Sequence, residues 1–287
     1  MLIRKVFSSR TRLFRGTTIL LISIVLLLFV LSAPKFEDGF ESGSFSLWDK
    51  MSPANGLGAP SIVEHQTHHG RYGAGFSSNP VTNNLSYVDH SVGSSTDLYA
   101  RGYFSISESN LKNDENRFVL ITFRARNDSL PVAYVGWRNY SGPVKWYLFI
   151  MNAAGGYNLS RSNLEPLIGR WYSVELHWRE GLVAELWVDD LLACSSVEKP
   201  TSGSGGVDAV RIGLGEPVTG GSTVVYVDCV AISGSRIWSE TPFASPRTWF
   251  LLVGIASAGI LVGTFVVDKW SSRFRTNISR DEETVVY

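Results

Sequence analysis

The sequence predicts an all-β domain, a sandwich of two antiparallel sheets, flanked by an N-terminal and a C-terminal transmembrane helix. Two observations predict this organisation. Two uncharged apolar stretches lie near the ends of the 287-residue chain, and short strand-like runs separated by Gly, Asn, Ser and Pro fill the region between them. The region between the stretches has no sustained 3.6-residue apolar period, which argues against helices there.

The apolar stretches cover residues 16–34 and 248–267. A helix needs about 20 apolar residues to cross a bilayer, so both are long enough. Basic residues are concentrated in residues 1–15 and 268–287, and the positive-inside rule therefore places both tails in the cytoplasm. We expect a protein of the cell membrane whose middle region is extracytoplasmic. The first stretch fits both a retained signal anchor and a cleavable signal peptide, and this choice stays open.

The region between the stretches is mildly acidic. Residues 35–247 contain 17 Lys and Arg against 22 Asp and Glu, which argues against a nucleic-acid partner, because phosphate binding needs a basic surface. We expect a β domain over residues 36–235 and a short Pro-containing stalk over residues 236–247. In the second stretch Gly259 and Gly263 are four residues apart, a spacing that allows two membrane helices to approach closely as a homodimer, although glycine is also ordinary there.

The expected strands follow one another at the spacing typical of a sandwich. In chain order they are residues 61–66, 72–77, 98–106, 117–126, 132–138, 144–151, 171–179, 183–188, 209–214 and 223–232. Several alternate cleanly: Leu98, Ala100 and Phe104 share one face, and Tyr99, Arg101 and Tyr103 share the other. Such alternation predicts one face in the core and one in solvent. Glu180-Gly181 predicts a tight hairpin.

Several motifs, in order, give a resemblance to a known superfamily. Phe40-Glu41-Ser42-Gly43 with Trp48 resembles the opening strand of concanavalin A-like, laminin-G-like jelly rolls. Residues 171–176 (WYSVEL) followed by residues 184–189 (AELWVD) are similar to the hairpin of these domains, with Asp190 where Gly is usual. Residues 225–228 (VYVD) resemble the closing strand. The resemblance spans about residues 36 to 233 and implies a jelly-roll sandwich with a concave face.

Members of this superfamily often bind glycans or proteins, and some cleave polysaccharides. We therefore expect a cell-surface protein that displays a glycan- or ligand-binding sandwich for recognition or adhesion. A structural envelope protein that contacts other proteins is one alternative, and an envelope polysaccharide hydrolase or lyase is another. No residue is predicted to be catalytic, so a non-enzymatic protein is the main expectation.

The expected ligand surface combines aromatic rings with arginines. Tyr99, Arg101 and Tyr103 share the non-core face of one strand, Arg124 belongs to the next, and Trp137 and Trp146 lie on the strands after that. If these strands adjoin, the six residues form a surface suited to a glycan, and the arginines favour an acidic one. The alternative is that the tryptophans are core residues and the arginines are solvated.

Cleavage has weaker support in the sequence. A retaining glycosidase needs two carboxylates about 5 Å apart, and Glu185 with Asp189 is the nearest approach to such a pair. A lyase needs a Tyr or His base beside Arg or Lys, and His177 joins Arg101, Tyr103 and Arg124 as available residues. No motif joins these residues into a site.

Asp38, Glu41 and Asp228 lie at the first and last strands, where carbohydrate-binding sandwiches often hold a structural calcium ion. Asp228 lies in a run that is apolar on both faces, and a buried carboxylate must be hydrogen-bonded, paired or metal-bound. Backbone hydrogen bonds and calcium both satisfy this requirement. His65, His68 and His69 also attract a metal interpretation, but no neighbouring Cys or acid completes a ligand set.

Two covalent features follow from the extracytoplasmic placement. An even number of cysteines in an oxidising compartment favours a disulfide between Cys194 and Cys229, with two separate thiols as the alternative. Glycosylation sequons occur at Asn84, Asn127, Asn139 and Asn158, so we expect a glycoprotein.

Overall fold

The computed structural model describes residues 34–52, 58–78, 85–111, 113–125, 131–201, 205–215 and 222–237. The chain divides into two units, Met1–Ile237 and Trp238–Tyr287. Several predicted features lie outside the described residues. They are the basic N-terminal tail, the first apolar stretch up to Ala33, and the whole second unit, which includes the second apolar stretch with Gly259 and Gly263. Within the described residues, no helix has the length and apolar character that crossing a membrane requires.

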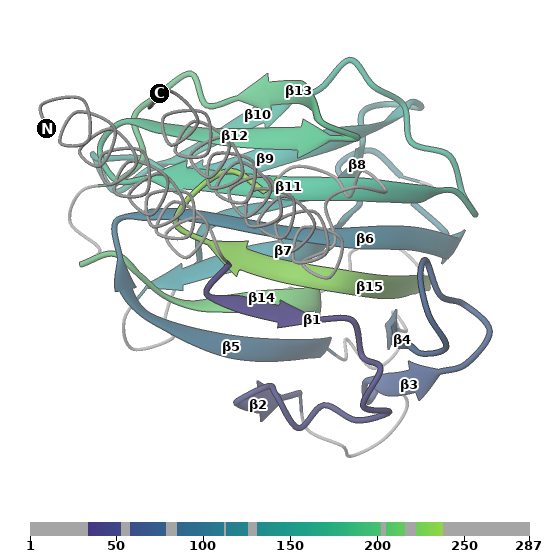
Figure 1. The fold of residues 1–287 in the computed structure, drawn as a ribbon. Helices are drawn as coiled ribbons and strands as arrows, with labels where there is room; N and C mark the ends of the chain where they lie inside the picture. Colours follow the sequence, from purple (N-terminus) through teal and green to yellow (C-terminus); the bar gives the residue numbers. More distant parts are fainter. Residues whose placement is uncertain are drawn as a thin grey trace, which may run out of the picture. The chain divides into compact units, whose positions relative to one another are not determined.

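The described part of the first unit is built from two antiparallel sheets, which confirms the all-β prediction (Figure 1). Sheet A has the strand order β13-β12-β11-β6-β15-β4-β3, with β1 paired to β15. Its strands are β1 (Phe36–Asp38), β3 (Ser61–Val63), β4 (Gly73–Ser78), β6 (Asp97–Ser109), β11 (Trp171–Arg179), β12 (Val183–Val188), β13 (Leu191–Ser195) and β15 (Thr223–Ser233). The first and last strands therefore lie side by side.

Sheet B has the strand order β10-β9-β8-β7-β14-β5-β2. Its strands are β2 (Lys50–Met51), β5 (Ser86–Ser95), β7 (Arg117–Ala125), β8 (Pro131–Asn139), β9 (Val144–Met151), β10 (Tyr157–Arg161) and β14 (Val207–Leu214). Strands β7 to β10 are consecutive and joined as hairpins, whereas β14 inserts between β5 and β7.

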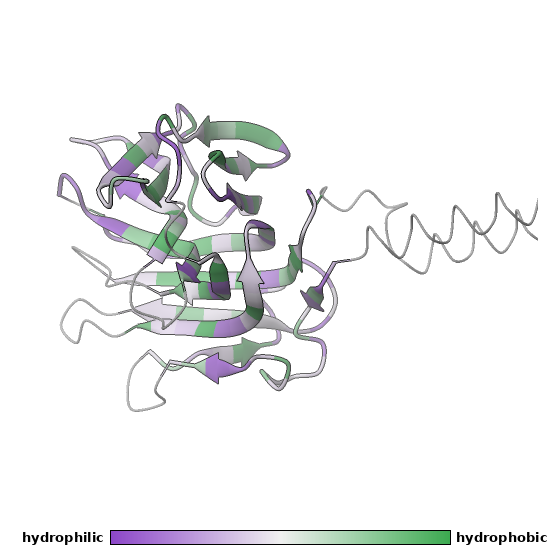
Figure 2. Cartoon of the chain, turned by 90° about the vertical axis from the view of Figure 1, so that its left-hand side faces the viewer, coloured by the Kyte–Doolittle hydropathy of each residue, from purple (hydrophilic) through white to green (hydrophobic). Residues whose placement is uncertain are grey.

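The core lies between the two sheets and is rich in aromatic rings. Apolar and polar bands alternate along the strands (Figure 2), as expected for strands with one face in the core. From sheet A the expected face of β6 is fully buried, including Leu98, Ala100 and Phe104. The ring of Trp146 on β9 lies edge-on against Tyr172 on β11, with centroids 5.3 Å apart, and so joins the two sheets.

The turns follow from local backbone chemistry. The hairpin predicted at Glu180-Gly181 joins β11 to β12, and Gly181 has a positive φ of 65°. Asp189 and Asp190 join β12 to β13 with φ values of 50° and 63°. Two consecutive left-handed residues form a type I′ turn, in which Asp is tolerated better than most side chains. Asp190 can therefore stand where the resembled hairpin has Gly.

Candidate functional site

The outer face of sheet B, which we call the sheet B face, collects polar and aromatic side chains in register. One row runs across five strands: Arg211 on β14, Thr122 on β7, Tyr134 on β8, Phe149 on β9 and Leu159 on β10. Because side chains alternate along a strand, the residues next to them, such as Phe123, Val135 and Leu148, point into the core. The row therefore lies on the side away from sheet A.

The β8–β10 side of this face is an aromatic surface. The rings of Tyr134 and Phe149 are stacked with centroids 4.2 Å apart and an interplanar angle of 5°. Tyr157 continues the surface, with its ring centroid 5.1 Å from that of Phe149, and 64% of it is exposed. Tyr157 presents an exposed apolar ring beside a polar hydroxyl, which suits a ligand with both C–H and hydroxyl groups, whereas Tyr134 is 7% exposed.

Cationic side chains surround the aromatic surface. They are Arg117 and Arg124 on β7, Arg138 on β8, Lys145 on β9 and Arg161 on β10. Two acids pair with members of this group: Glu115 lies 2.9 Å from Arg138 and Glu165 lies 2.8 Å from Lys145. The guanidinium groups of Arg138 and Arg161 both lie over the ring of Tyr140, at 5.3 and 5.6 Å from its centroid. The arrangement favours an anionic ligand.

Buried polar groups line the middle of the sheet B face. Arg211 and Asp89 form a bidentate ion pair of 2.7 and 2.9 Å, and the guanidinium lies 3.6 Å from the centroid of the Tyr87 ring. Thr122 is 0% exposed, and its Oγ1 has no hydrogen-bond partner among the described residues. A buried hydroxyl normally has a partner, so Thr122 is an unusual position in this sheet.

The β2–β5 end of the same face is hollowed and acidic. A hollow of about 440 Å³ is lined by Asp49, Lys50, Asp89, Ser91, Ala125, Asp208 and Ala209. Three of these side chains are carboxylates and one is a lysine. The charge of the sheet B face therefore changes from acidic at this end to basic over β7–β10.

The outer face of sheet A, which we call the sheet A face, holds the predicted residues Tyr99, Arg101 and Tyr103. Tyr99 stacks on His177 at 3.9 Å, and Tyr103 stacks on His68 at 3.7 Å. Arg101 and Tyr103 are buried although they point away from the core. The prediction that this face is exposed to solvent is therefore wrong for the middle of sheet A.

The segment after β15 covers part of the sheet A face. The Arg236 guanidinium lies 3.5 Å from the centroid of the Trp187 ring, and the Ile237 amide donates to Glu175 Oε2 at 2.9 Å. Burial raises the pKa of Glu175 to about 7, against the hydrogen bond from Ile237 and the nearby arginines, which lower it. This part of the sheet A face is filled by the chain itself.

The six residues expected to form one ligand surface are divided among three places. Tyr99, Arg101 and Tyr103 are on the sheet A face, and Arg124 is on the sheet B face. Trp137 and Trp146 lie in the core, 2% and 1% exposed, with their rings edge-on and 5.6 Å apart. Strands β6 and β7 follow each other in sequence but belong to opposite sheets, so the six residues do not form one surface.

The three carboxylates considered for calcium are each held by N–H donors. Asp38 accepts from the Phe40 amide and from Trp48 Nε1, both at 2.7 Å. Glu41 accepts from the amides of Arg71 and Tyr72. N–H groups therefore hold the carboxylates of Asp38 and Glu41 in place without a bound ion.

Asp228, the third of them, accepts from the amides of His68 and His69, each at 2.8 Å, and from that of Cys229 at 2.6 Å. Burial raises the pKa of Asp228, whereas these hydrogen bonds lower it. Backbone hydrogen bonding, the alternative considered for this carboxylate, is what the structure has.

No disulfide joins Cys194 and Cys229, which corrects the predicted pairing. Cys194 is on β13 and Cys229 is on β15, and β12, β11 and β6 lie between these strands. Four strand spacings amount to roughly 19 Å, whereas the Cα atoms of a disulfide are usually less than about 7 Å apart. Burial raises the pKa of the Cys194 thiol to about 12.

The predicted glycosylation sites fall in different settings. Asn84 and Asn127 lie outside the described residues. Asn158 is half-buried on β10. Asn139 is 4% exposed, and its Nδ2, the atom that would carry a glycan, donates to the Leu111 carbonyl at 2.6 Å. In the folded domain Asn139 is therefore not available for modification.

The residues considered for cleavage are also engaged in the fold. His177 lies between Glu185 Oε2 at 2.9 Å and Asp97 Oδ1 at 3.0 Å. Asp189 accepts from the Ser173 amide at 3.0 Å and pairs with Arg170 at 2.7 Å. Glu185 therefore pairs with His177, and Asp189 makes its contacts within the hairpin that it closes.

Comparison with known proteins identifies the fold. No protein-family model matches the chain, and no curated protein sequence does so either. The endo-β-1,4-glucuronan lyase of the fungus Trichoderma reesei is similar, with a TM-score of 0.56 and 18% identity over 71% of this chain and 96% of that one. The cellulose-induced protein Cip1 matches with a TM-score of 0.53 and 15% identity over 72% of this chain and 100% of that one. The described domain shares the β-sandwich architecture of these two proteins.

Proposed function

We propose that the sheet B face binds a carbohydrate chain that carries acidic groups. The observation that carries this proposal is the combination of stacked rings and cations over β7–β10, which ends in the exposed pair Tyr157 and Arg161. Rings would stack on the sugar faces, and guanidinium groups would pair with carboxylates in the bidentate geometry that arginine allows. The shared fold of a glucuronan lyase, a protein named for an acidic polysaccharide, is consistent with this ligand class.

The proposed setting is the outside of a membrane. β1 and β15 pair, so the two ends of the domain leave from neighbouring strands, with Phe36 opposite Ile232. This arrangement suits a domain held by apolar stretches on both sides. A protein that displays such a domain would recognise glycans of an envelope, a matrix or another cell.

Binding of the purified full-length chain to an array of neutral and uronate-containing oligosaccharides tests the proposal. We expect signals for uronates that fall with added salt, because exposed ion pairs are screened. Tyr157→Ala and Arg161→Ala should each weaken binding by about tenfold, or about 1.4 kcal/mol. Leu191→Ala and Arg71→Ala are the matched controls, since both residues are exposed on sheet A or its loops. Equal signals for all sugars, or equal loss in the controls, would favour a structural envelope role.

Cleavage of the same ligand by elimination is the second candidate. Tyr134 lies opposite Thr122 on the sheet B face, and Arg124 is two residues further along β7. Elimination needs a cation beside the uronate carboxylate and a base for the adjacent proton. The neighbouring Tyr147 does not supply that base, because complete burial raises its pKa well above 10. Appearance of unsaturated sugar ends in a polyuronate incubated with the protein, and their loss in Tyr134→Phe, would favour this candidate.

A further inference from the structure

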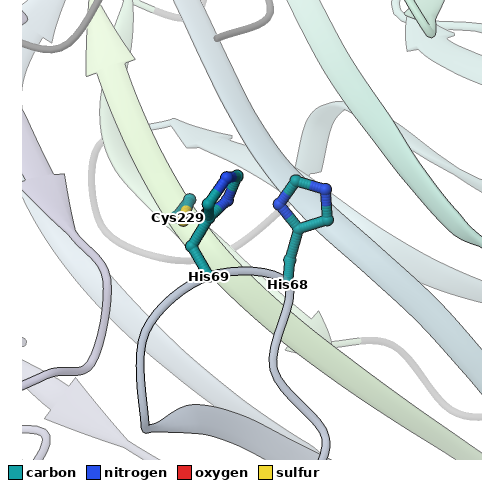
Figure 3. Close-up of side chains that lie close together, drawn as sticks. All are labelled: His68, His69 and Cys229. Atoms are coloured by element: carbon teal, nitrogen blue, oxygen red, sulfur yellow. Dashed lines mark hydrogen bonds between the residues drawn. The ribbon is translucent and has the colours of Figure 1, made fainter. Parts of the chain in front are cut away.

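Two histidines and a cysteine meet beside the sheet A face, far from the proposed carbohydrate surface. His68 and His69 lie in the loop between β3 and β4, and Cys229 lies in β15, 160 residues further along the chain from His69. Figure 3 shows the two imidazole rings and the thiol close together. Cys229 Sγ is 3.9 Å from His69 Nδ1, and one ligand atom from each of the three residues lies within 4.8 Å of the others.

Asp228 holds the backbone of this cluster in place. The amides of all three residues donate to its carboxylate, two from the loop and one from β15. This one buried carboxylate therefore fixes the histidine loop against the strand that carries the thiol. The fold therefore brings the three side chains together without a bound ion.

The backbone of β15 is distorted where it presents the thiol. The register with β6 shifts between Asp228 and Ala231, which is a β-bulge, and Cys229 has a φ of 48°. A bulge re-aims a side chain out of the strand alternation, and a positive φ at a non-glycine residue costs of the order of 1–3 kcal/mol. Such strain is found most often where the fold serves a site.

Aromatic packing orients one of the histidines. The His68 ring stacks on Tyr103 at 3.7 Å and 12°, and its centroid is 5.7 Å from that of Trp171. A histidine ligand binds a metal well when its ring orientation is fixed by neighbours. His69 is exposed, whereas His68 and Cys229 are partly buried, so the cluster opens to solvent on one side.

We propose that His68, His69 and Cys229 bind a divalent cation of the zinc type. Two imidazole nitrogens and a thiolate are the donors that zinc prefers, and hard cations such as calcium prefer oxygen. Metal–ligand distances of about 2.0–2.3 Å around a tetrahedral zinc separate the ligand atoms by roughly 3.3–3.8 Å. The 3.9 Å between Sγ and Nδ1 needs only a small side-chain rotation to reach that spacing.

Binding of the metal has a defined proton balance. Cys229 Sγ lies 3.4 Å from Asp228 Oδ1, a contact in which a thiol donates its proton to the carboxylate. Coordination replaces the S–H bond with a metal–sulfur bond and releases one proton to solvent. Three protein ligands leave the fourth tetrahedral position on the open side for water or for a donor from a bound partner.

Titration of the full-length chain with Co²⁺ tests the site, because a cobalt–thiolate bond gives a charge-transfer band in the near ultraviolet. We expect the band to saturate at one equivalent, to disappear on addition of Zn²⁺ and to persist in excess Ca²⁺. Cys229→Ser should abolish it, and His69→Ala should weaken Co²⁺ binding by at least about tenfold. Cys194→Ser and His65→Ala, which change the other cysteine and the nearby histidine outside the cluster, should leave the titration unchanged.

Alkylation of the unmutated chain provides a test that does not depend on the folding of a variant. Zn²⁺ should slow the reaction of Cys229 with iodoacetamide by at least about tenfold, as read by mass spectrometry, while that of Cys194 stays unchanged. An absent cobalt band, a band that survives Cys229→Ser, or Cys229 that alkylates equally fast with and without Zn²⁺ would each overturn the proposal.

Discussion

At the scale of single residues, Glu175 is a carboxyl group that the fold removes from water, with 3% of the residue exposed. It lies on β11, where burial raises the pKa to about 7 from an ordinary value of 4.5. Arg236 Nε is 3.8 Å from its Oε1 and Ile237 donates to its Oε2, yet these contacts offset only part of the desolvation. The folded protein therefore holds this proton at pH values where the unfolded chain has released it.

This difference makes stability depend on pH in a defined direction. Between about pH 4.5 and 7 the folded state binds more protons at this site than the unfolded state, so the free energy of unfolding falls as pH rises through that window. At about 1.4 kcal/mol for each tenfold change in proton affinity, the ionised form costs of the order of 3 kcal/mol above pH 7.

Glu175→Gln isolates this effect, because glutamine keeps an acceptor for the Ile237 amide and carries no charge. We expect the variant to have a higher thermal midpoint than the unmodified protein at pH 8, with the difference shrinking towards zero at pH 5. Calorimetry at both pH values measures it. A variant that is less stable at pH 8 would show that the ion pair with Arg236 outweighs desolvation.

At the scale of elements, the buried ion pair between Asp89 and Arg211 joins β5 to β14. β14 reaches its place between β5 and β7 from a distant part of the sequence, so its cross-strand contacts must specify its position. Both side chains are buried, and two hydrogen bonds connect them. Removing one partner of such a pair leaves an uncompensated buried charge.

Asp89→Ala should therefore lower the free energy of unfolding by about 3–5 kcal/mol. Glu115→Ala is the matched control, because it removes an ion pair to Arg138 at the surface of the same sheet, where such pairs contribute at most about 1 kcal/mol. Denaturant unfolding of both variants makes the comparison. Equal losses would mean that Arg211 finds another partner or becomes solvated.

The strands with strong apolar alternation could be predicted from the sequence almost to the residue. β9, β11 and β12 have the expected bounds, and the buried face of β6 is the expected one. The sequence does not predict β5, β10 and β13, because these strands are short or rich in polar residues and Gly. They form because neighbouring strands pair with them. Local pattern does not encode that contribution.

The candidate site could be predicted less well, for a reason visible in two strands. Tryptophans were favoured as ligand residues by type, yet alternation places Trp137 with Val135 and Trp146 with Leu148, which is the core face. The same alternation places Tyr134 and Phe149 on the opposite face, so the sequence pattern could have identified them as candidate ligand residues. Which sheet each strand joins is a long-range property, and the division of β6 and β7 between two sheets has no local signal.

At the scale of the whole molecule, the placement of the domain relative to the membrane is the remaining proposal. The paired strands β1 and β15 bring residues 36 and 232 together, so the chain enters and leaves the described domain at neighbouring strands. The burial of two apolar helices in lipid would then force the domain to one side of the bilayer and both basic tails to the other.

Cysteine labelling on intact cells tests this arrangement. In a Cys229→Ser background, Val197→Cys places a thiol at a position that is 86% exposed after β13, while Ser271→Cys places one in the predicted cytoplasmic tail. The remaining native thiol, Cys194, reacts slowly because burial raises its pKa to about 12. We expect a membrane-impermeant maleimide to label position 197 on intact cells and position 271 only after permeabilisation. The reverse pattern would place the domain in the cytoplasm, where an extracellular glycan could not reach the sheet B face.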